Sequence, residues 1–92
     1  MTKFIIVLPK STPQQQMTLH NYFLPRRASW WHWSPEVWLL TFQFENPTVE
    51  QLREEIRQIL PLSFFLVFNL DNSPYSGWGP DEWQQWFVLN WK

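Results

Sequence analysis

The apolar pattern opens with an unbroken run over residues 4–8, which a proline ends. β-Branched and aromatic residues without polar alternation are typical of a strand buried on both faces. A helix is then expected from Thr12 to about Leu24, because a hydroxyl residue before proline caps a helix start and Pro25 disfavours helical geometry in the residue before it. Three residues are predicted to lie on one side of this helix: Met17, His20 and Leu24.

Two strands are predicted next, over residues 29–33 and 37–44, around a proline-containing turn. The clearest helix follows, begun either by Asn46 as a cap or by Thr48 and Gln51 as a capping box. A fourth strand is expected over residues 63–70, which are apolar at nearly every position. A last helix is expected to begin near Asp81, where acids favour the helix dipole. The residues predicted to share a face of that helix are Trp83, Trp86 and Phe87.

The order β-α-β-β-α-β, followed by an aromatic C-terminal helical segment, predicts an α+β ferredoxin-like fold. Such a fold places two helices on one face of a four-stranded antiparallel sheet, and the other face is ordinarily polar. Here the predicted strands supply large apolar groups to both faces, and the adjacent Trp30 and Trp31 must point to opposite sides. An apolar sheet face exposed to solvent would promote aggregation of the protein. The second face is therefore expected to be covered by the C-terminal segment, a second copy or a different protein.

Composition and charge narrow the class of protein. The 92 residues are predicted to form a single domain, residues 1–92, and 20% of them are aromatic, which excludes a disordered chain. With a net charge of −1, the chain has no overall electric field that would attract nucleic acid or acidic lipid. The absence of cysteine fits a reducing compartment. With no predicted signal peptide or membrane span, the expected location is the cytoplasm.

Three segments, two of them with tryptophans, together form a recognisable pattern. They are Trp30-Trp31-His32-Trp33 with Trp38, a helix over 48–56 around Leu52-Arg53, and an apolar strand over 64–70 followed by Gly77-Trp78. In these segments, which span residues 29 to about 80, the chain resembles the small bacterial and phage proteins described as SinR-like. The resemblance implies the ferredoxin-like fold of the small CRISPR-adaptation subunit, whose relatives include metal-dependent nucleases and toxin–antitoxin proteins.

The end of the first strand departs from the nuclease pattern. In those nucleases a carboxylate near this point, paired across a homodimer, holds the metal. This chain has Val7-Leu8-Pro9-Lys10 there, with no acid. The resemblance therefore implies a fold used for dimerisation or protein binding rather than for inherited nuclease chemistry.

Few polar residues are candidates for chemistry. His32 shares a predicted face with Trp30 and is interpreted as packed against rings rather than catalytic, with His20 the only other imidazole. Asp71 and Asp81 are not at metal-ligand spacing from these histidines, so no metal, cofactor or catalytic residue is predicted.

Three other positions are candidates for binding. The adjacent pair Arg26-Arg27 is expected to face a protein or solvent, because the chain has too few basic residues for strong phosphate binding. Trp78, between two glycines, is either an interface anchor or a ring folded over the bare sheet face.

The sequence predicts a non-catalytic, homodimeric protein that binds another protein through an aromatic-rich surface. The family resemblance implies a phage or mobile-element setting. In that setting the protein would inhibit or regulate a host defence complex. The alternatives are a metal-dependent nuclease using Asp71 and His32, and a single-strand nucleic-acid binder that stacks bases on tryptophans. The predicted contact residues are Trp31, Trp33, Trp78, Arg26, Arg27 and His32.

Overall fold

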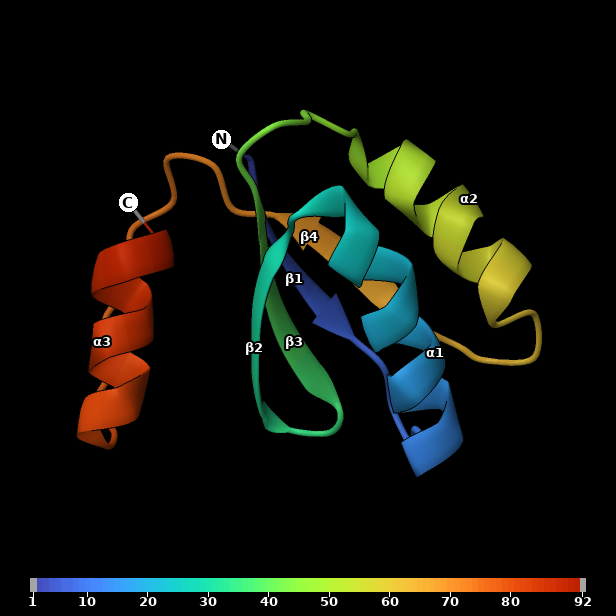
Figure 1. Ribbon diagram of the computed structural model, residues 1–92, viewed down its shortest axis with the longest axis horizontal. Coiled ribbons are helices and arrows are strands. Elements are labelled where there is room, and N and C mark those ends of the chain that lie inside the picture. The colour runs from blue at the N-terminus through green and yellow to red at the C-terminus, as the bar shows by residue number, and fades with distance from the viewer. Residues whose placement is uncertain (1, 92) are drawn as a thin grey trace.

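The computed structural model describes residues 2–91, apart from the side chain of Trp33. Strands and helices follow one another as β, α, β, β, α, β and α, with a short 3-10 turn after the first helix (Figure 1). Their bounds are β1 Thr2–Val7, α1 Pro13–Phe23, η1 Leu24–Arg26, β2 Ser29–Ser34, β3 Val37–Phe42, α2 Val49–Ile59, β4 Leu66–Asn69 and α3 Asp81–Asn90.

The strands form one antiparallel sheet in the order β2-β3-β1-β4. At its centre β1 pairs with β3 so that Phe4 lies opposite Leu40, and on its other side β1 pairs with β4 so that Ile5 lies opposite Phe68. The edge strand β2 has a register shift between Trp31 and Ser34. The predicted α+β class with a four-stranded antiparallel sheet is confirmed.

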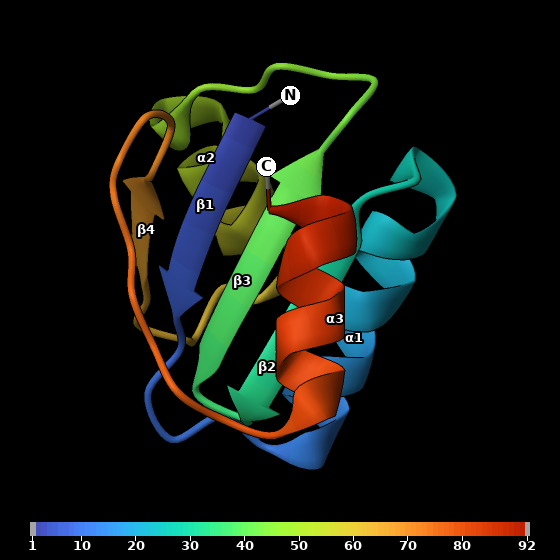
Figure 2. The same ribbon diagram turned by 90° about the vertical axis from the view of Figure 1, so that its left-hand side faces the viewer.

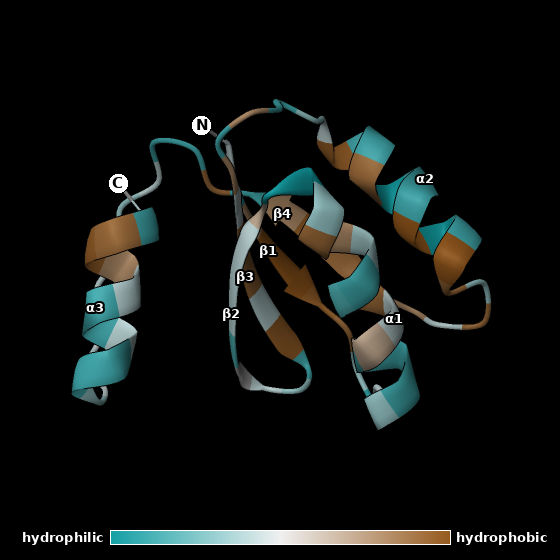
Figure 3. Ribbon diagram, in the orientation of Figure 1, coloured by the Kyte–Doolittle hydropathy of each residue, from teal (hydrophilic) through white to brown (hydrophobic). Residues whose placement is uncertain are grey.

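The sheet lies between two helical layers. Helices α1 and α2 cover one face, and α3 lies against the other face over β2 and β3 (Figures 1 and 2). The main core fills the space between the sheet and the first two helices, and the buried hydrophobic residues of α2 face it while polar residues face outward (Figure 3). The fully buried members include Phe4, Ile6, Leu19, Phe23, Trp38, Leu40, Leu52 and Ile56.

Helix α3 covers part of the second face of the sheet (Figure 2). The C-terminal segment returns across the sheet within the same chain, which was one of the three expected solutions (Figure 2). None of the residues of α3 itself is buried, although Trp91, which follows it, is only 4% exposed. The second layer is therefore packed less completely than the first. No helix among the described residues has the length and apolar character to cross a membrane.

Capping boxes begin the first two helices. Thr12 accepts a hydrogen bond from the backbone N–H of Gln15 at 3.2 Å, and the Gln15 side chain accepts one from the N–H of Thr12. Thr48 and Gln51 repeat this arrangement, so of the two predicted starts for α2 the capping box is the one used. Reciprocal capping satisfies two N–H groups that a helix start otherwise leaves unpaired.

Two predicted strands are too long, and the buried residues of α1 are Leu19 and Phe23. The strand predicted over residues 37–44 ends at Phe42. The predicted strand over residues 63–70 is shorter, Leu66–Asn69, and its apolar residues are not buried on both sides. The reason is the position of β4 at the sheet edge, beyond the reach of α3 (Figure 2).

Candidate functional site

The candidate site is an apolar hollow on the α3 face of the sheet. Its volume is about 360 Å³. Strands β2 and β3, the loop that carries Trp78 and helix α3 supply its lining, and no charged side chain is among the described residues that line it. The predicted contact residues Trp31 and Trp78 come together here. The residues that line the hollow are Trp31, Val37, Leu39, Trp78 and Trp83.

Strand alternation directs Trp31 into this hollow. Trp30 points to the opposite side, where it packs against the main core and donates a hydrogen bond from Nε1 to Nε2 of His20 at 2.9 Å. Trp31 instead lies near the ring of Trp86 in α3, with 6.5 Å between ring centroids. The Nε1 group of Trp31 is buried without a hydrogen-bond partner among the described residues. The tryptophan doublet thus connects the sheet to both helical layers.

Trp78 is the most exposed tryptophan among the described side chains, at 94%. Gly77 and Gly79 flank it, and the ring of Trp83 packs against both glycines. A Cβ at Gly77 would lie 3.1 Å from Cη2 of Trp83. The close approach of loop and helix leaves Trp78 standing at the rim of the hollow, so the alternative in which its ring folds down over the sheet is wrong.

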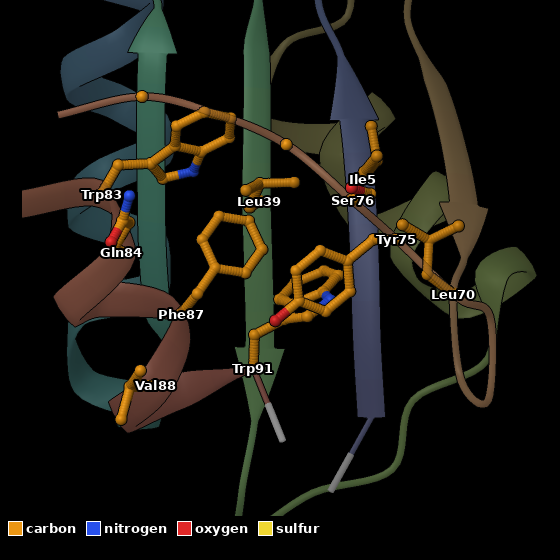
Figure 4. A pocket seen from close by; sticks show the side chains of 12 residues that line it. Ile5, Leu39, Leu70, Tyr75, Ser76, Trp83, Gln84, Phe87, Val88 and Trp91 are labelled. Atoms are coloured by element: carbon orange, nitrogen blue, oxygen red, sulfur yellow. The ribbon is translucent and has the colours of Figure 1, made fainter. Parts of the chain in front are cut away.

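A second apolar groove adjoins the first, since both are lined by Leu39 and Trp83. Its volume is about 370 Å³, within the range of ligand-sized sites. Figure 4 shows Leu39 and Ile5 on its sheet side, with the rings of Phe87 and Trp91 facing them from the C-terminal segment. Tyr75 closes one side by stacking on Phe87, with ring centroids 4.8 Å apart.

Two acidic residues begin α3, and Lys3 lies near Trp91 at the end of the C-terminal segment. Asp81 and Glu82 begin α3 immediately after the loop that carries Trp78, and both are exposed. At the far end of the groove, Nζ of Lys3 lies 5.7 Å from the ring centroid of Trp91. Two exposed carboxylates therefore follow Trp78 closely along the chain.

Two histidines and two tryptophans form a cluster on the opposite side of the sheet. His32 stacks on Trp38, with ring centroids 4.2 Å apart and an angle of 16° between the planes. His20 meets His32 edge-on at 5.5 Å and accepts the hydrogen bond from Trp30. Burial lowers the pKa of His32, and the nearby His20 lowers it further. This arrangement fits the interpretation of His32 as a packed residue.

The lowered pKa of His32 predicts that acid weakens the fold. Folded His32 binds a proton less readily than unfolded His32. Above the ordinary histidine pKa, about 6.5, both states are neutral and His32 makes no pH-dependent contribution to stability. As the pH drops below that value, the unfolded state gains the proton first and the free energy of unfolding falls. His32→Phe keeps a ring against Trp38 and cannot titrate, so its unfolding free energy is expected to change less with pH. Urea unfolding at about pH 7.5 and 5.5 measures both slopes. Equal slopes for the two proteins would contradict the prediction.

The two arginines lie apart from the aromatic hollow. Arg26 donates hydrogen bonds to both carboxylate oxygens of Glu45, at 2.8 and 3.0 Å, and to Oε2 of Glu55 at 2.7 Å. Its guanidinium also lies 4.9 Å from the ring centroid of Phe42. Arg27 is exposed, with its guanidinium 5.6 Å from the ring of Phe44. Arg26 therefore joins the end of α1 to α2, and a partner would have to break these pairs to use it.

The predicted contact residues thus do not form one surface. Trp31 and Trp78 share the hollow on the α3 face, whereas His32 and Arg26 belong to the side of α1 and α2. The side chain of Trp33 lies outside the described part of the chain. Its contribution to a contact stays a prediction.

Asp71 and His32 have different surroundings. Oδ1 of Asp71 accepts a hydrogen bond from the backbone N–H of Lys3 at 2.7 Å, which ties the segment after β4 to β1. His32 instead contacts His20 and Trp38. Within the described residues, no three side chains of the histidine or carboxylate type gather in a way that would hold a metal ion. Asp71 and His32 therefore take part in separate contacts.

Comparison of the chain with protein families, with curated proteins and with solved structures finds no match.

Several groove residues were not predicted from the sequence. Leu39, Tyr75 and Trp91 all line the grooves, yet none was singled out. A signal for Trp91 is present, because it follows Trp83 and Phe87 at four-residue spacing and so continues the same helical face. Tyr75 lies in an irregular segment, where no periodicity predicts the direction of a side chain.

Proposed function

We propose that this chain is a non-catalytic protein-binding module whose contact surface centres on Trp78. The observation that carries the proposal is the 94% exposure of this ring at the rim of an apolar hollow. Tryptophan is enriched among residues that dominate binding energy. Burying a ring of about 200 Å² at roughly 25 cal/mol per Å² is worth up to about 5 kcal/mol.

The shape and charge of the site indicate the chemistry of the partner. The hollow beside Trp78 is lined by apolar residues alone, so it suits an apolar side chain of the partner. Asp81 and Glu82 follow Trp78 by three and four residues along the chain, and these exposed carboxylates favour basic groups on the partner. The same carboxylates oppose phosphate, and Arg26 is engaged elsewhere, so the position of these charges favours a protein over a nucleic acid.

The finer fold assignment is also part of the proposal. The succession of elements and the antiparallel strand order β2-β3-β1-β4 support a ferredoxin-like scaffold with α3 added to its second face. The pattern of tryptophans supports a SinR-like origin, and with it a role of the protein against a host defence complex. In this proposal the scaffold holds the Trp78 loop rigid, and binding at the hollow blocks a surface of the partner.

Photo-crosslinking in cells tests the proposal. A benzoylphenylalanine that replaces Trp78 is expected to give a light-dependent adduct with one protein, and the adduct is expected to have the same mass in repeated experiments. The same residue at Met17, which is 60% exposed on α1, is the matched control and is expected to give no such adduct. Adducts that disappear on nuclease treatment, or equal adducts at both positions, would contradict protein binding at Trp78.

A further inference from the structure

Strand β4 presents a free sheet edge that lacks the usual protection. The other edge strand, β2, has a register shift between Trp31 and Ser34, and such irregularities discourage the addition of a strand. Strand β4 pairs with β1 without interruption over Leu66–Asn69 and contains neither a charge nor a proline. An even, apolar edge of this kind is suited to pair with a further strand.

The backbone groups that point outward from β4 can be assigned. The N–H of Leu70 donates to the carbonyl of Lys3 at 2.8 Å, and in an antiparallel pair the residues that bond inward alternate with those that do not. Leu66 and Phe68 therefore bond to β1, whereas Val67 and Asn69 direct their N–H and C=O groups to the free edge. Among the described residues, no hydrogen bond across that edge occupies them.

An exposed apolar row accompanies this edge. Phe64, Leu66 and Phe68 are 89%, 60% and 50% exposed. Phe65 and Val67 pack against the main core, so alternation places the exposed row on the α3 face. Helix α3 lies over β2 and β3, and residues 70–80 pass on the α3 side of the half formed by β1 and β4 (Figure 2), yet the row keeps the exposure given above.

The exposed area is a substantial share of what a stable dimer needs. With about 200 Å² for a phenylalanine and somewhat less for a leucine, the row exposes about 400 Å² per copy. A standard interface buries about 800 Å² on each partner. The edge backbone and the neighbouring surface of α2 would supply the rest.

The charges next to the edge are self-complementary. Glu50 and Arg53 of α2 line a small hollow of about 200 Å³ together with Phe65, Leu66 and Val67. A two-fold axis brings the same surface from both copies together, so a patch with both signs can pair with itself.

We propose that two copies of this chain join through β4, antiparallel to each other, into one continuous eight-stranded sheet. A two-fold axis at Val67 places Leu66 of one copy opposite Phe68 of the other. The outward N–H and C=O groups of Val67 then pair with those of the other Val67. This surface is separate from the Trp78 hollow, so the dimer would leave both hollows free for the proposed partner.

Sedimentation analysis tests the dimer. The wild-type protein is expected to sediment as a concentration-dependent dimer, and Phe68→Lys is expected to weaken association more than about tenfold, because it places a charge in an apolar contact. Leu89→Lys, at a residue of α3 that is 68% exposed, is the matched control and should leave the dimer intact. A wild-type monomer at about 100 µM, well above the micromolar range of weak but specific complexes, would overturn the proposal.

Amide hydrogen exchange keeps the proposal testable even if a variant fails to fold. In the wild-type protein, the amides of Val67 and Asn69 are expected to gain protection as protein concentration rises, because only the dimer gives them acceptors. Unchanged exchange of these amides in a dimeric sample would overturn it.

The two proposals fail in different ways. Trp78→Ala is expected to leave association unchanged. Loss of the dimer in Trp78→Ala, with Phe68→Lys still dimeric, would place self-association at the hollow and overturn the β4 pairing.

Discussion

Arg26→Ala is expected to lower the free energy of unfolding by about 2 to 3 kcal/mol, since breaking a buried ion pair is strongly destabilising. The Arg26 side chain is only 17% exposed and donates to Glu45 and Glu55, with which it forms a network that joins three segments of the chain. Its removal leaves both carboxylates without that partner and strips the cation from the ring of Phe42. The two carboxylates keep side-chain exposures of 40% and 33%, so the loss stays below that of a fully buried pair.

Urea unfolding followed by tryptophan fluorescence measures this loss. Arg27→Ala is the matched control: this next residue is exposed and its guanidinium lies over the exposed ring of Phe44, so its change should stay within about 0.5 kcal/mol. Arg26→Lys keeps the charge but not the two-pronged contact with Glu45, and an intermediate loss is expected. Equal stabilities for Arg26→Ala and Arg27→Ala would show that the network does not hold the fold.

Gly79→Ala is expected to cost about 1 to 3 kcal/mol and to loosen α3 from the sheet, because overpacking forces side chains out of their preferred positions. A Cβ at this residue would fall on Cε3 of Trp83 and lie 2.6 Å from Cζ3. The indole is rigid and is held between the loop and the sheet, so the whole ring has to move. The movement opens both apolar grooves, which Trp83 lines.

Gly77→Ala is the matched control for this substitution. There the new methyl group would lie 3.1 Å from Cη2 of the same ring, a contact that a shift of a few tenths of an ångström relieves. Urea unfolding gives the stability of each variant, and binding of a dye to exposed apolar surface reports opening of the grooves. If the two variants are equally stable and equally closed, the loop does not pack on Trp83 as described.

Local rules predicted most of the fold. The hydroxyl of Thr12 before a proline predicted the start of α1, and the capping box of Thr48 and Gln51 was one of the two starts predicted for α2, because capping depends only on nearby residues. The length of β4 was overestimated, since the apolar run over 63–70 does not reveal that the strand lies at the sheet edge. Which layer covers a strand is decided by the path of the whole chain, and periodicity within one segment carries no such information.

The candidate site was predicted only in part. Trp31 and Trp78 share the hollow because strand alternation and flanking glycines act locally. Arg26 was grouped with them because it is close in sequence, but it folds to the other side, where Glu45 and Glu55 attract it. Partners so distant along the chain could not be recognised without the fold.

Both apolar grooves exist only because α3 covers the second sheet face within one chain. Nuclear Overhauser contacts between the rings of Trp31 and Trp86 test this directly, because the structure places their centroids 6.5 Å apart. The contacts are expected in uniformly labelled protein and are expected to vanish in an isotope-filtered experiment on mixed labelled and unlabelled copies. Their absence from the first spectrum, or their appearance in the second, would mean that α3 is detached or is supplied by another copy.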